Sequence, residues 1–382
     1  MAQQKVQLAR PIFAKIAPHE FLVANLVRSS SDSDGQEGQS GTRPNGRTPE
    51  ESRAFDIHTG SLSQAHGSAA VRLGRTRVIC GVRGEILPVD NIPQYRPSST
   101  WTSTRRSDDA TNSVIEAENR RQLREYDLLV PNLELASGSA PEFLPGGPPS
   151  VLAQVLTTRL YALLHSSGIV DADSLKIWHQ PRGELAKELI EDDIEMDDEQ
   201  DESEEADKED DDRSPILKAY WTLYIDVLFL SFDGNPMDAA WAAIVAALRD
   251  TRLPHARWDT DRDCFVCAPP TVTPALPLTL RGLPVATTAA VCVENRKRQQ
   301  RQSSDAVGAH WILEDPDRFE EGLCHETATV VVDCSNGTGK NTIVRALSKS
   351  GGVFLGPKEL HTLVLSAEKR WASLLKALAT GS

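Results

Sequence analysis

One stretch of the sequence reads Trp221-Thr-Leu-Tyr-Ile-Asp-Val-Leu-Phe-Leu-Ser-Phe-Asp-Gly-Asn-Pro236 and continues as Met237-Asp-Ala-Ala-Trp-Ala-Ala-Ile-Val-Ala-Ala-Leu248. Its first part is the most continuous apolar, β-prone run in the chain, and both alternating sets of positions carry apolar residues. A run of this kind predicts a central β-strand that is covered on both faces, with Asp226 interrupting one of them.

The residues after this strand predict a turn and the start of a helix. Asp233-Gly-Asn235 ends the strand, Asn235 suits a helix N-cap, and Pro236 suits the first helical position. An apolar stripe with helical spacing follows, formed by Trp241, Ile244, Val245 and Leu248. Because alanine fills most of the other positions, we expect this helix to lie close against its neighbours.

Composition is typical of a globular protein with one large or two ordinary domains, since 40% of the 382 residues are hydrophobic and 25% are charged. No apolar run reaches the roughly 18 residues that a membrane span needs. The scattered cysteines favour reduced thiols over a disulfide framework; they are Cys80, Cys264, Cys267, Cys292, Cys324 and Cys334.

The net charge of −14 is concentrated in one segment. Residues 191–212 contain 16 Asp or Glu and one Lys, a net charge of −15, so the rest of the chain carries +1. We expect a solvated, self-repelling loop here, because the run lacks the glycine and ligand spacing of a calcium-binding EF-hand. The near-neutral remainder removes any argument from overall charge against nucleic-acid binding.

The first half of the chain carries further structural signals. Residues 18–27 predict a short amphipathic helix, and 29–42 read as a disordered linker. Pro44-Asn-Gly46 predicts a turn flanked by two arginines, and residues 68–83 predict a hairpin. Residues 84–145 read as turn-rich, and 173–179 as a short strand. A helix after residues 146–150 has an apolar face formed by Val151, Val155, Leu156, Leu160 and Leu163.

The last third repeats the pattern of strands followed by a helix. Strands are predicted at 285–292, 310–314, 328–334 and 341–347, and Asn336-Gly337 is a strong hairpin signal between the last two. The terminal helix has one apolar face: Leu360, Leu363, Val364, Ala367, Trp371, Leu374, Leu375 and Leu378. The repetition predicts a duplicated α+β architecture.

Two motifs suggest phosphate or metal binding and fail on spacing. Asn336-Gly-Thr-Gly-Lys-Asn341 resembles a phosphate-binding loop, but Cys334 and Asn341 stand where Gly and Ser or Thr are required. A hairpin turn explains it better, so nucleotide binding is the weakest alternative. Cys264-Phe-Val-Cys267 has the spacing of half a zinc site, yet only Cys324-His325 could complete it, so strand cysteines are favoured.

Three carboxylates around the central strand are the sharpest catalytic candidates. Asp226, Asp233 and Asp238 could bind a metal or act as general acid and base. The competing interpretation is that Asp233 makes the turn and that Asp238 lies near the positive end of the helix dipole. On spacing alone this second interpretation is favoured. A regular strand would point Asp226 and Asp233 to opposite faces.

Several motifs, in order, resemble the ribonuclease PH family. They are Arg43-Pro-Asn-Gly-Arg47, Arg53, Gly67-Ser-Ala-Ala-Val-Arg-Leu-Gly74, Val78-Ile-Cys-Gly-Val82, Ile225-Asp-Val-Leu228, Asp233-Gly-Asn-Pro-Met-Asp-Ala239, Leu283-Pro-Val-Ala-Thr-Thr288 and Asp315-Pro316. The resemblance covers residues 43–382 outside the acidic insert. It implies an α+β fold of two pseudo-symmetric halves, each a sheet with packed helices.

The resemblance also implies a loss of catalysis. Active members carry Asp-Gly-Gly-Thr-Arg at the turn, where this chain has Asp233-Gly-Asn-Pro-Met237, and an arginine-rich stretch where it has Gly146-Gly-Pro-Pro-Ser150. Phosphorolysis needs positive charge where inorganic phosphate attacks. Asp226, Asp233 and Asp238 are therefore expected to be degenerate active-site positions, with no catalytic residue, metal or cofactor. The alternative is an active phosphate-dependent 3′-to-5′ exoribonuclease.

Within the family, the chain resembles the non-catalytic ring subunits of the eukaryotic RNA exosome. This implies a role in ribosomal RNA maturation and RNA turnover, in the nucleus, the nucleolus and the cytoplasm, away from membranes. The implied partners are related subunits in a hetero-hexameric ring, cap subunits of the S1 and KH types, a hydrolytic nuclease, and RNA. The candidate RNA-binding residues are Arg83, Arg105 and Arg106.

The resemblance divides the chain into segments. Residues 1–28 form an N-terminal helical segment, and 29–42 form the linker. Residues 43–250 form the first half, with the acidic insert at 186–214. Residues 251–382 form the second half.

Overall fold

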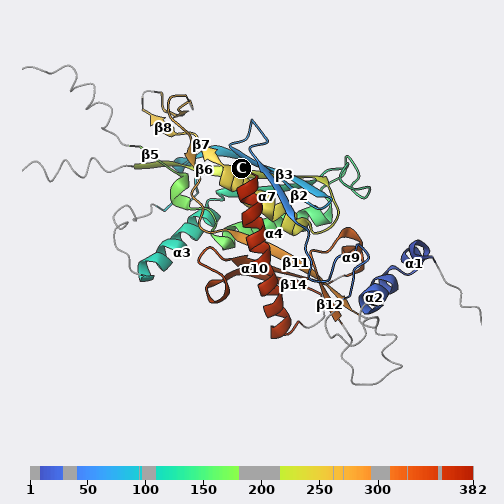
Figure 1. Ribbon diagram of the computed structural model, residues 1–382. Helices are drawn as coiled ribbons and strands as arrows, with labels where there is room; N and C mark the ends of the chain where they lie inside the picture. Colours follow the sequence, from blue (N-terminus) through green and yellow to red (C-terminus); the bar gives the residue numbers. More distant parts are fainter. Residues whose placement is uncertain are drawn as a thin grey trace, which may run out of the picture.

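A computed structural model describes the protein over residues 9–28, 41–93, 95–96, 109–179, 216–260, 262–269, 271–293, 310–324, 326–351 and 355–381, with only the backbone given for 109–116. Two β-sheets with helices packed on and between them make up this part of the chain (Figure 1). The predicted α+β class is therefore confirmed.

The first sheet is centred on the predicted long strand. Its order is β1-β2-β3-β6-β4, and β5 also pairs with β6. The β4–β6 pair is parallel, and the other pairs are antiparallel. The strands are β1 (Phe55–Thr59), β2 (Gly67–Leu73), β3 (Thr76–Pro88), β4 (Leu129–Leu135), β5 (Lys176–His179) and β6 (Ile216–Ser231). The β2–β3 pair is the predicted hairpin.

The second sheet has the antiparallel order β12-β11-β13-β14. Its strands are β11 (Pro284–Val293), β12 (His310–Glu314), β13 (Glu326–Asp333) and β14 (Ile343–Ser350). All four were predicted, because each is an uninterrupted β-prone run bounded by turn residues. Two small pairs lie apart from the sheets: β7 (Arg252–Leu253) with β10 (Leu276–Pro277), and β8 (Ala256–Asp259) with β9 (Cys264–Cys267).

Helix α7 (Pro236–Asp250) is enclosed between the two sheets, and 13 of its 15 residues are buried. It packs against β1, β2 and β3 on one side and against β11 on the other. Trp241 fixes this arrangement by donating from Nε1 to the carbonyl oxygen of Pro284 at 2.9 Å. The small side chains allow close approach, as predicted. At Gly67 a Cβ would lie 2.6 Å from the carbonyl oxygen of Ala247 in α7.

Strand β6 is buried on both faces from Ala219 to Leu223 but on one face only from Tyr224 onward, so the prediction of two covered faces was wrong for that second part. Leu223, Ile225, Val227 and Phe229 are buried, whereas Asp226 and Leu230 on the other face are exposed. The reason is that the core helix α7 occupies one face of the sheet. Tyr224, Leu228 and Leu230 on the opposite face form an apolar strip that the described residues do not fully cover.

The segment 84–145 is more regular than its turn-rich sequence predicts. It contains η1 (Val89–Asn91), α3 (Asp109–Glu125) and β4. The predicted strand at 173–179 begins as the 3-10 helix η3 (Ala172–Leu175), and only β5 is extended. In α4 (Val151–Ser167), Leu156, Leu160 and Leu163 are buried as predicted. Val151 and Val155 were also predicted to be buried, but they lie in the first turns of α4 and are exposed.

The other helices join the two halves and the N-terminal segment. Helix α10 (Pro357–Thr380) packs against β11, β13 and β1, and of its predicted face only Leu375 is exposed. Helix α2 (Pro18–Arg28) lies beside α9 (Arg318–Leu323), and α1 (Arg10–Ile16) lies beside α2 (Figure 1). Residues Leu22 and Leu26 of α2 share a cluster with Leu313 of the second sheet.

Some predictions fall on residues outside the described ranges. These are most of the linker 29–42, the acidic insert 186–214, and Arg105 and Arg106. The division near residue 250 stays a prediction; it falls between α7 and β7. None of the helices in the described part of the chain is long and apolar enough to cross a membrane.

Candidate functional site

The turn after β6 brings the two halves of the chain into contact. Asn235 adopts a left-handed conformation (φ 50°) and caps α7 by accepting from the Asp238 N–H at 3.4 Å. Gly234 has φ 79°, and a Cβ there would lie 2.5 Å from the backbone nitrogen of Arg318 in α9. Only glycine fits this close approach in that conformation. The predicted N-cap is confirmed, and the turn that contains it packs directly against the backbone of α9 in the second half of the chain.

Asp315, at the end of β12, is the most heavily paired carboxylate of this contact. Arg53 donates from Nε to Oδ2 and from Nη2 to Oδ1, both at 2.8 Å, and Asn235 donates to Oδ1 at 2.7 Å. The carboxylate is 1% exposed. Burial alone would raise the pKa of Asp315, but the Arg53 hydrogen bonds and the charges of Arg370 and Arg53 hold it well below its usual range.

The segment that contains Arg43 and Arg47 folds onto the acidic turn around Asp315. Arg43 Nη1 lies 3.3 Å from Glu320 Oε2, and both side chains are fully buried. Arg47 Nη1 lies 3.3 Å from Asp315 Oδ2. Glu320 also completes a capping box at the start of α9. Burial of the Glu320 carboxyl group raises its pKa, which the charge of Arg43 partly offsets.

We call this set of residues the charged turn cluster: Arg43, Arg47, Arg53, Asp233, Asn235, Asp238, Asp315, Glu320, Glu321 and Arg370. Its cations come from residues 43–53 and from α10, and its carboxylates from the turns after β6 and β12, from α7 and from α9. Sequence reasoning did not foresee these pairs. Signals were present in the clustered arginines at 43–53 and the acidic run at 314–321, but nothing in the sequence links them.

Of the three candidate carboxylates, Asp238 and Asp233 belong to the cluster. Asp238 is buried, and it accepts from the Thr288 hydroxyl at 2.7 Å and from the Thr288 N–H at 3.0 Å. Its burial raises its pKa. This carboxylate therefore ties α7 to β11 and does not face solvent, which agrees with the interpretation of Asp238 as a residue of the first helical turn.

Asp233 is the partly exposed member of the cluster. Its side chain is 34% exposed, and its Oδ2 lies 3.9 Å from Arg53 Nη1. Burial raises the pKa of Asp233, and the positive charge of Arg53 lowers it. Because β6 ends at Ser231, Asp233 lies in the turn. The alternation of side chains along a regular strand therefore does not determine where the Asp233 side chain points relative to Asp226.

Asp226 stands apart from the other two carboxylates. It lies within β6 on the open face, where it accepts from Asn132 Nδ2 at 3.2 Å. Arg83 lies on the same sheet, is exposed, and pairs with Glu85 at 3.1 Å. Its guanidinium also lies 5.7 Å from the centre of the Tyr224 ring. The structure therefore does not gather Asp226 with Asp233 and Asp238.

The start of α4 carries no cationic side chain within residues 146–150. Ser150 caps the helix by accepting from the Ala153 N–H at 3.2 Å. Arg159, further along α4, donates to the hydroxyl groups of Thr329 at 3.0 Å and Ser348 at 2.9 Å. The first turn of α4 thus offers backbone N–H groups but no guanidinium for phosphate.

The two rejected motifs are structural in the described residues. Asn336 to Asn341 lie in the loop between β13 and β14, so the predicted hairpin is confirmed. Cys264 and Cys267 lie on β9. Across the ranges that the structure describes, no group of three or more His, Cys, Asp or Glu side chains could hold a metal ion.

The fold is that of the ribonuclease PH class of proteins. Residues 51–254 match the 3′ exoribonuclease family, domain 1. The chain belongs to this family.

Known relatives and solved structures agree with this assignment. The exosome complex component rrp43 of Schizosaccharomyces pombe is 27% identical over 361 residues, which cover 94% of each chain. The exosome complex component Rrp42 of Archaeoglobus fulgidus is 24% identical over 322 residues, 84% of this chain and 85% of that one.

Two solved structures share the fold. The Archaeoglobus fulgidus exosome with RNA bound to the active site superimposes with a TM-score of 0.55 at 21% identity, over 96% of this chain and 98% of that one. An archaeal exosome core gives a TM-score of 0.52 at 20% identity, over 95% and 98%. The predicted ribonuclease PH-like fold is therefore confirmed.

Proposed function

We propose that this chain is a non-catalytic subunit of an RNA exosome core ring, of the ribosomal RNA-processing protein 43 type, which supports 3′-to-5′ RNA processing and decay. One observation carries the proposal: the arginines at the turn of the charged turn cluster are bound to carboxylates of the same chain. Arg53 donates two hydrogen bonds to the Asp315 carboxylate, and Arg43 forms an ion pair with Glu320. Relatives that match along most of their length are named as exosome components, which supports the same assignment.

The electrostatics of this end of the molecule argue against phosphorolysis. A phosphate that attacks RNA must be held by positive groups, because its charge would otherwise be repelled by the carboxylates. Arg53 is committed to Asp315, and the start of α4 supplies no cation. We therefore infer that the chain positions RNA and partner subunits, while degradation is carried out by another subunit, such as a hydrolytic nuclease.

The competing function is an active phosphate-dependent 3′-to-5′ exoribonuclease. Asp233 favours it, because its carboxyl group is partly exposed and burial raises its pKa toward the range of a general acid. Asp226 adds little to this alternative, since it lies within β6 on the open face.

The absence of catalysis is a testable prediction. A purified ring that contains the chain is expected to release no nucleoside diphosphates attributable to this subunit from labelled single-stranded RNA and inorganic phosphate. Rings with Asp226→Ala or Asp233→Ala should therefore match the parent ring. Diphosphate release by the parent that is lost with Asp233→Ala would establish the exoribonuclease alternative.

The second sheet offers a surface suited to a neighbouring ring subunit. Strand β14 pairs only with β13 in the described part of the chain, so its outer edge presents unpaired backbone groups. Its apolar side chains Val344 and Leu347 are exposed. On the opposite face of this sheet, helix α4 packs beside β14, where Arg159 donates to Ser348, and its first turns carry the exposed Val151 and Val155. An unpaired edge beside an apolar strip is typical of a surface that another β-protein covers.

We predict that ring assembly depends on this surface. Leu347→Asp is expected to weaken co-assembly with a related subunit by about 2 kcal/mol or more, because a charge would replace an apolar side chain that the proposed interface buries. Size-exclusion chromatography with light scattering measures this. Leu276→Asp is a matched control, since Leu276 is similarly exposed but lies on β10. Equal assembly of both variants would place the interface elsewhere.

The remaining expectations extend this proposal. Cap subunits of the S1 and KH types would dock on the assembled ring, and RNA would pass through it. Arg83 is a candidate RNA contact, together with Arg105 and Arg106 from outside the described residues. We propose the nucleus and the nucleolus, and also the cytoplasm, as the sites where this subunit acts.

A further inference from the structure

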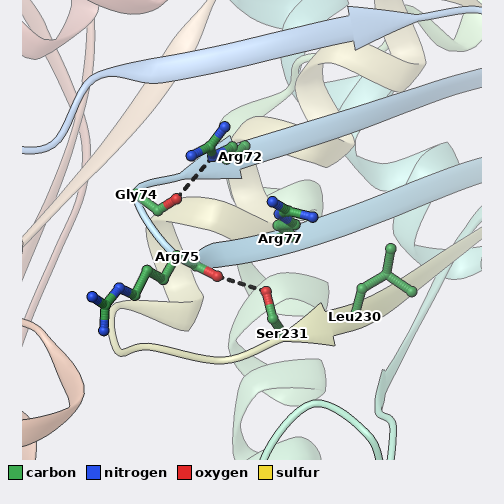
Figure 2. A pocket seen from close by; sticks show the side chains of 6 residues that line it. All are labelled: Arg72, Gly74, Arg75, Arg77, Leu230 and Ser231. Atoms are coloured by element: carbon green, nitrogen blue, oxygen red, sulfur yellow. Dashed lines mark hydrogen bonds between the residues drawn. The ribbon is translucent and has the colours of Figure 1, made fainter.

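A pocket of about 290 Å³ lies where the β2–β3 turn meets the end of β6. It is lined by Arg72, Gly74, Arg75, Arg77, Leu230 and Ser231 (Figure 2). Three of its six residues are arginines, and each of the three is exposed. The pocket lies outside the charged turn cluster, and nothing in the proposed subunit role accounts for it.

Arg72 and Arg77 face each other across the hairpin. They are direct register partners on β2 and β3, and Figure 2 shows their guanidinium groups on the same side of the sheet. Arg75 extends from the turn in another direction. Like charges directly opposite each other destabilise a sheet, unless an anion lies between them. The hairpin therefore carries a cost that a bound anion would remove.

The described residues do not supply that anion. None of Arg72, Arg75 and Arg77 has a carboxylate oxygen within 4.0 Å in the described ranges, in contrast to Arg43, Arg47 and Arg53. Asp56 stands opposite Arg72 on β1, but its carboxylate lies 3.4 Å from His58. The Arg72 Nε donates to the Gly74 carbonyl oxygen at 3.0 Å, which orients the guanidinium and leaves its other N–H groups available.

The backbone of the turn fixes this arrangement. Gly74 has φ 62°, and a Cβ there would lie 2.5 Å from Arg53 Cδ. The Ser231 hydroxyl donates to the Arg75 carbonyl oxygen at 2.6 Å, which ties the turn to the end of β6. Arg72 and Arg77 thus project from a turn whose backbone is fixed by its contacts with Arg53 and Ser231, beside the charged turn cluster.

We propose that this pocket binds a backbone phosphate of single-stranded RNA between Arg72 and Arg77. The planar guanidinium fork matches a phosphate oxygen pair. Leu230, which is 46% exposed, provides an apolar floor for the adjoining ribose or base. A volume near 300 Å³ suits one nucleotide-sized group. The proposal rests on the proposed function, because that function makes RNA the polymer at hand; an acidic protein segment would offer carboxylates but no base for Leu230.

The test measures RNA binding by the purified full-length chain. Fluorescence anisotropy with a labelled oligouridine of about 12 nucleotides is recorded over a salt series. The Arg72→Gln/Arg77→Gln double variant is expected to bind about tenfold more weakly at low salt. Its slope of log affinity against log salt should become shallower by about 0.7, since the one phosphate contact that is lost contributes about 0.7 on a single strand.

Two control variants distinguish RNA binding at this pocket from a nonspecific effect of net charge. The Arg249→Gln/Arg252→Gln variant loses the same charge at exposed positions far along the chain, and it should keep parental affinity and slope. The Arg72→Lys/Arg77→Lys variant keeps the charge and should keep most of the slope. Near-UV circular dichroism should be the same for all variants, because Arg72 and Arg77 lie outside the core.

Equal RNA binding by the parent and the Arg72→Gln/Arg77→Gln variant would overturn the proposal. So would a polyglutamate peptide that binds the parent more tightly than the oligouridine and loses binding in this variant. Failure of the chain to co-assemble with a related subunit, measured separately by light scattering, would instead overturn the proposed ring function and leave the RNA result standing.

Discussion

Arg53→Ala is expected to lower the free energy of unfolding by about 3–5 kcal/mol, the usual consequence of removing one partner of a buried ion pair. Arg53 supplies two side-chain hydrogen bonds to Asp315 and one to the carbonyl oxygen of Asp233 at 2.9 Å. Without it, a carboxylate that is 1% exposed would keep its charge with fewer partners. Urea unfolding followed by tryptophan fluorescence, at fixed protein concentration, measures the loss.

The matched control is Arg83→Ala. Arg83 also forms an ion pair with a carboxylate, but its side chain is 61% exposed, so the expected loss is about 1 kcal/mol or less. The loss of stability in Arg53→Lys should lie between these two values, because lysine keeps the positive charge but cannot donate two parallel hydrogen bonds to the carboxylate. If Arg53→Ala cost no more than Arg83→Ala, the charged turn cluster would not be holding the two halves together.

Glu321→Gln is expected to stabilise the protein at pH 8 by about 3 kcal/mol. Burial raises the pKa of Glu321 to about 7, although the Asn235 N–H donates to its Oε1 at 2.8 Å. The ordinary value is 4.5. Between these values the folded chain holds a proton that the unfolded chain has lost, so parental stability falls as pH rises from 4.5 to 7.

The glutamine variant isolates this effect because its amide oxygen can still accept from Asn235. The variant and the parent should have equal stability near pH 4.5 and diverge as pH rises, with the variant the more stable. Asp315 acts in the opposite sense: its lowered pKa gives stability that is present above about pH 4 and lost on further acidification. Glu134→Gln, at an exposed position, is the control. A constant difference between Glu321→Gln and the parent across pH would contradict the prediction.

Local sequence determined the elements of this protein. The run from Trp221 to Leu248 specified a strand, a turn and a helix, because apolar spacing, the Asn235 cap and Pro236 act over a few residues. The β2–β3 hairpin and α10 followed from the same kinds of signal. The departure from active members at residues 146–150 and 233–237 was also visible in the sequence, since it is a matter of which residue types are present.

Tertiary structure alone decided which faces are covered and which charges meet. The second half of β6 is apolar at both alternating sets of positions, yet only the face that carries α7 is covered there. Strand β4 and helix α3 were hidden in a segment rich in turn residues, because pairing with β6 and tertiary packing outweighed weak local preference.

The charged turn cluster shows the same limit most clearly. Arg53 and Asp315 are separated by 262 residues, and Arg43 and Glu320 by 277. No local pattern relates them, since charges that far apart in sequence pair only after both sheets and α7 have packed. Folding therefore decided that the arginines would neutralise carboxylates of the same chain, and that Arg72 and Arg77 would be left without such partners in the described residues.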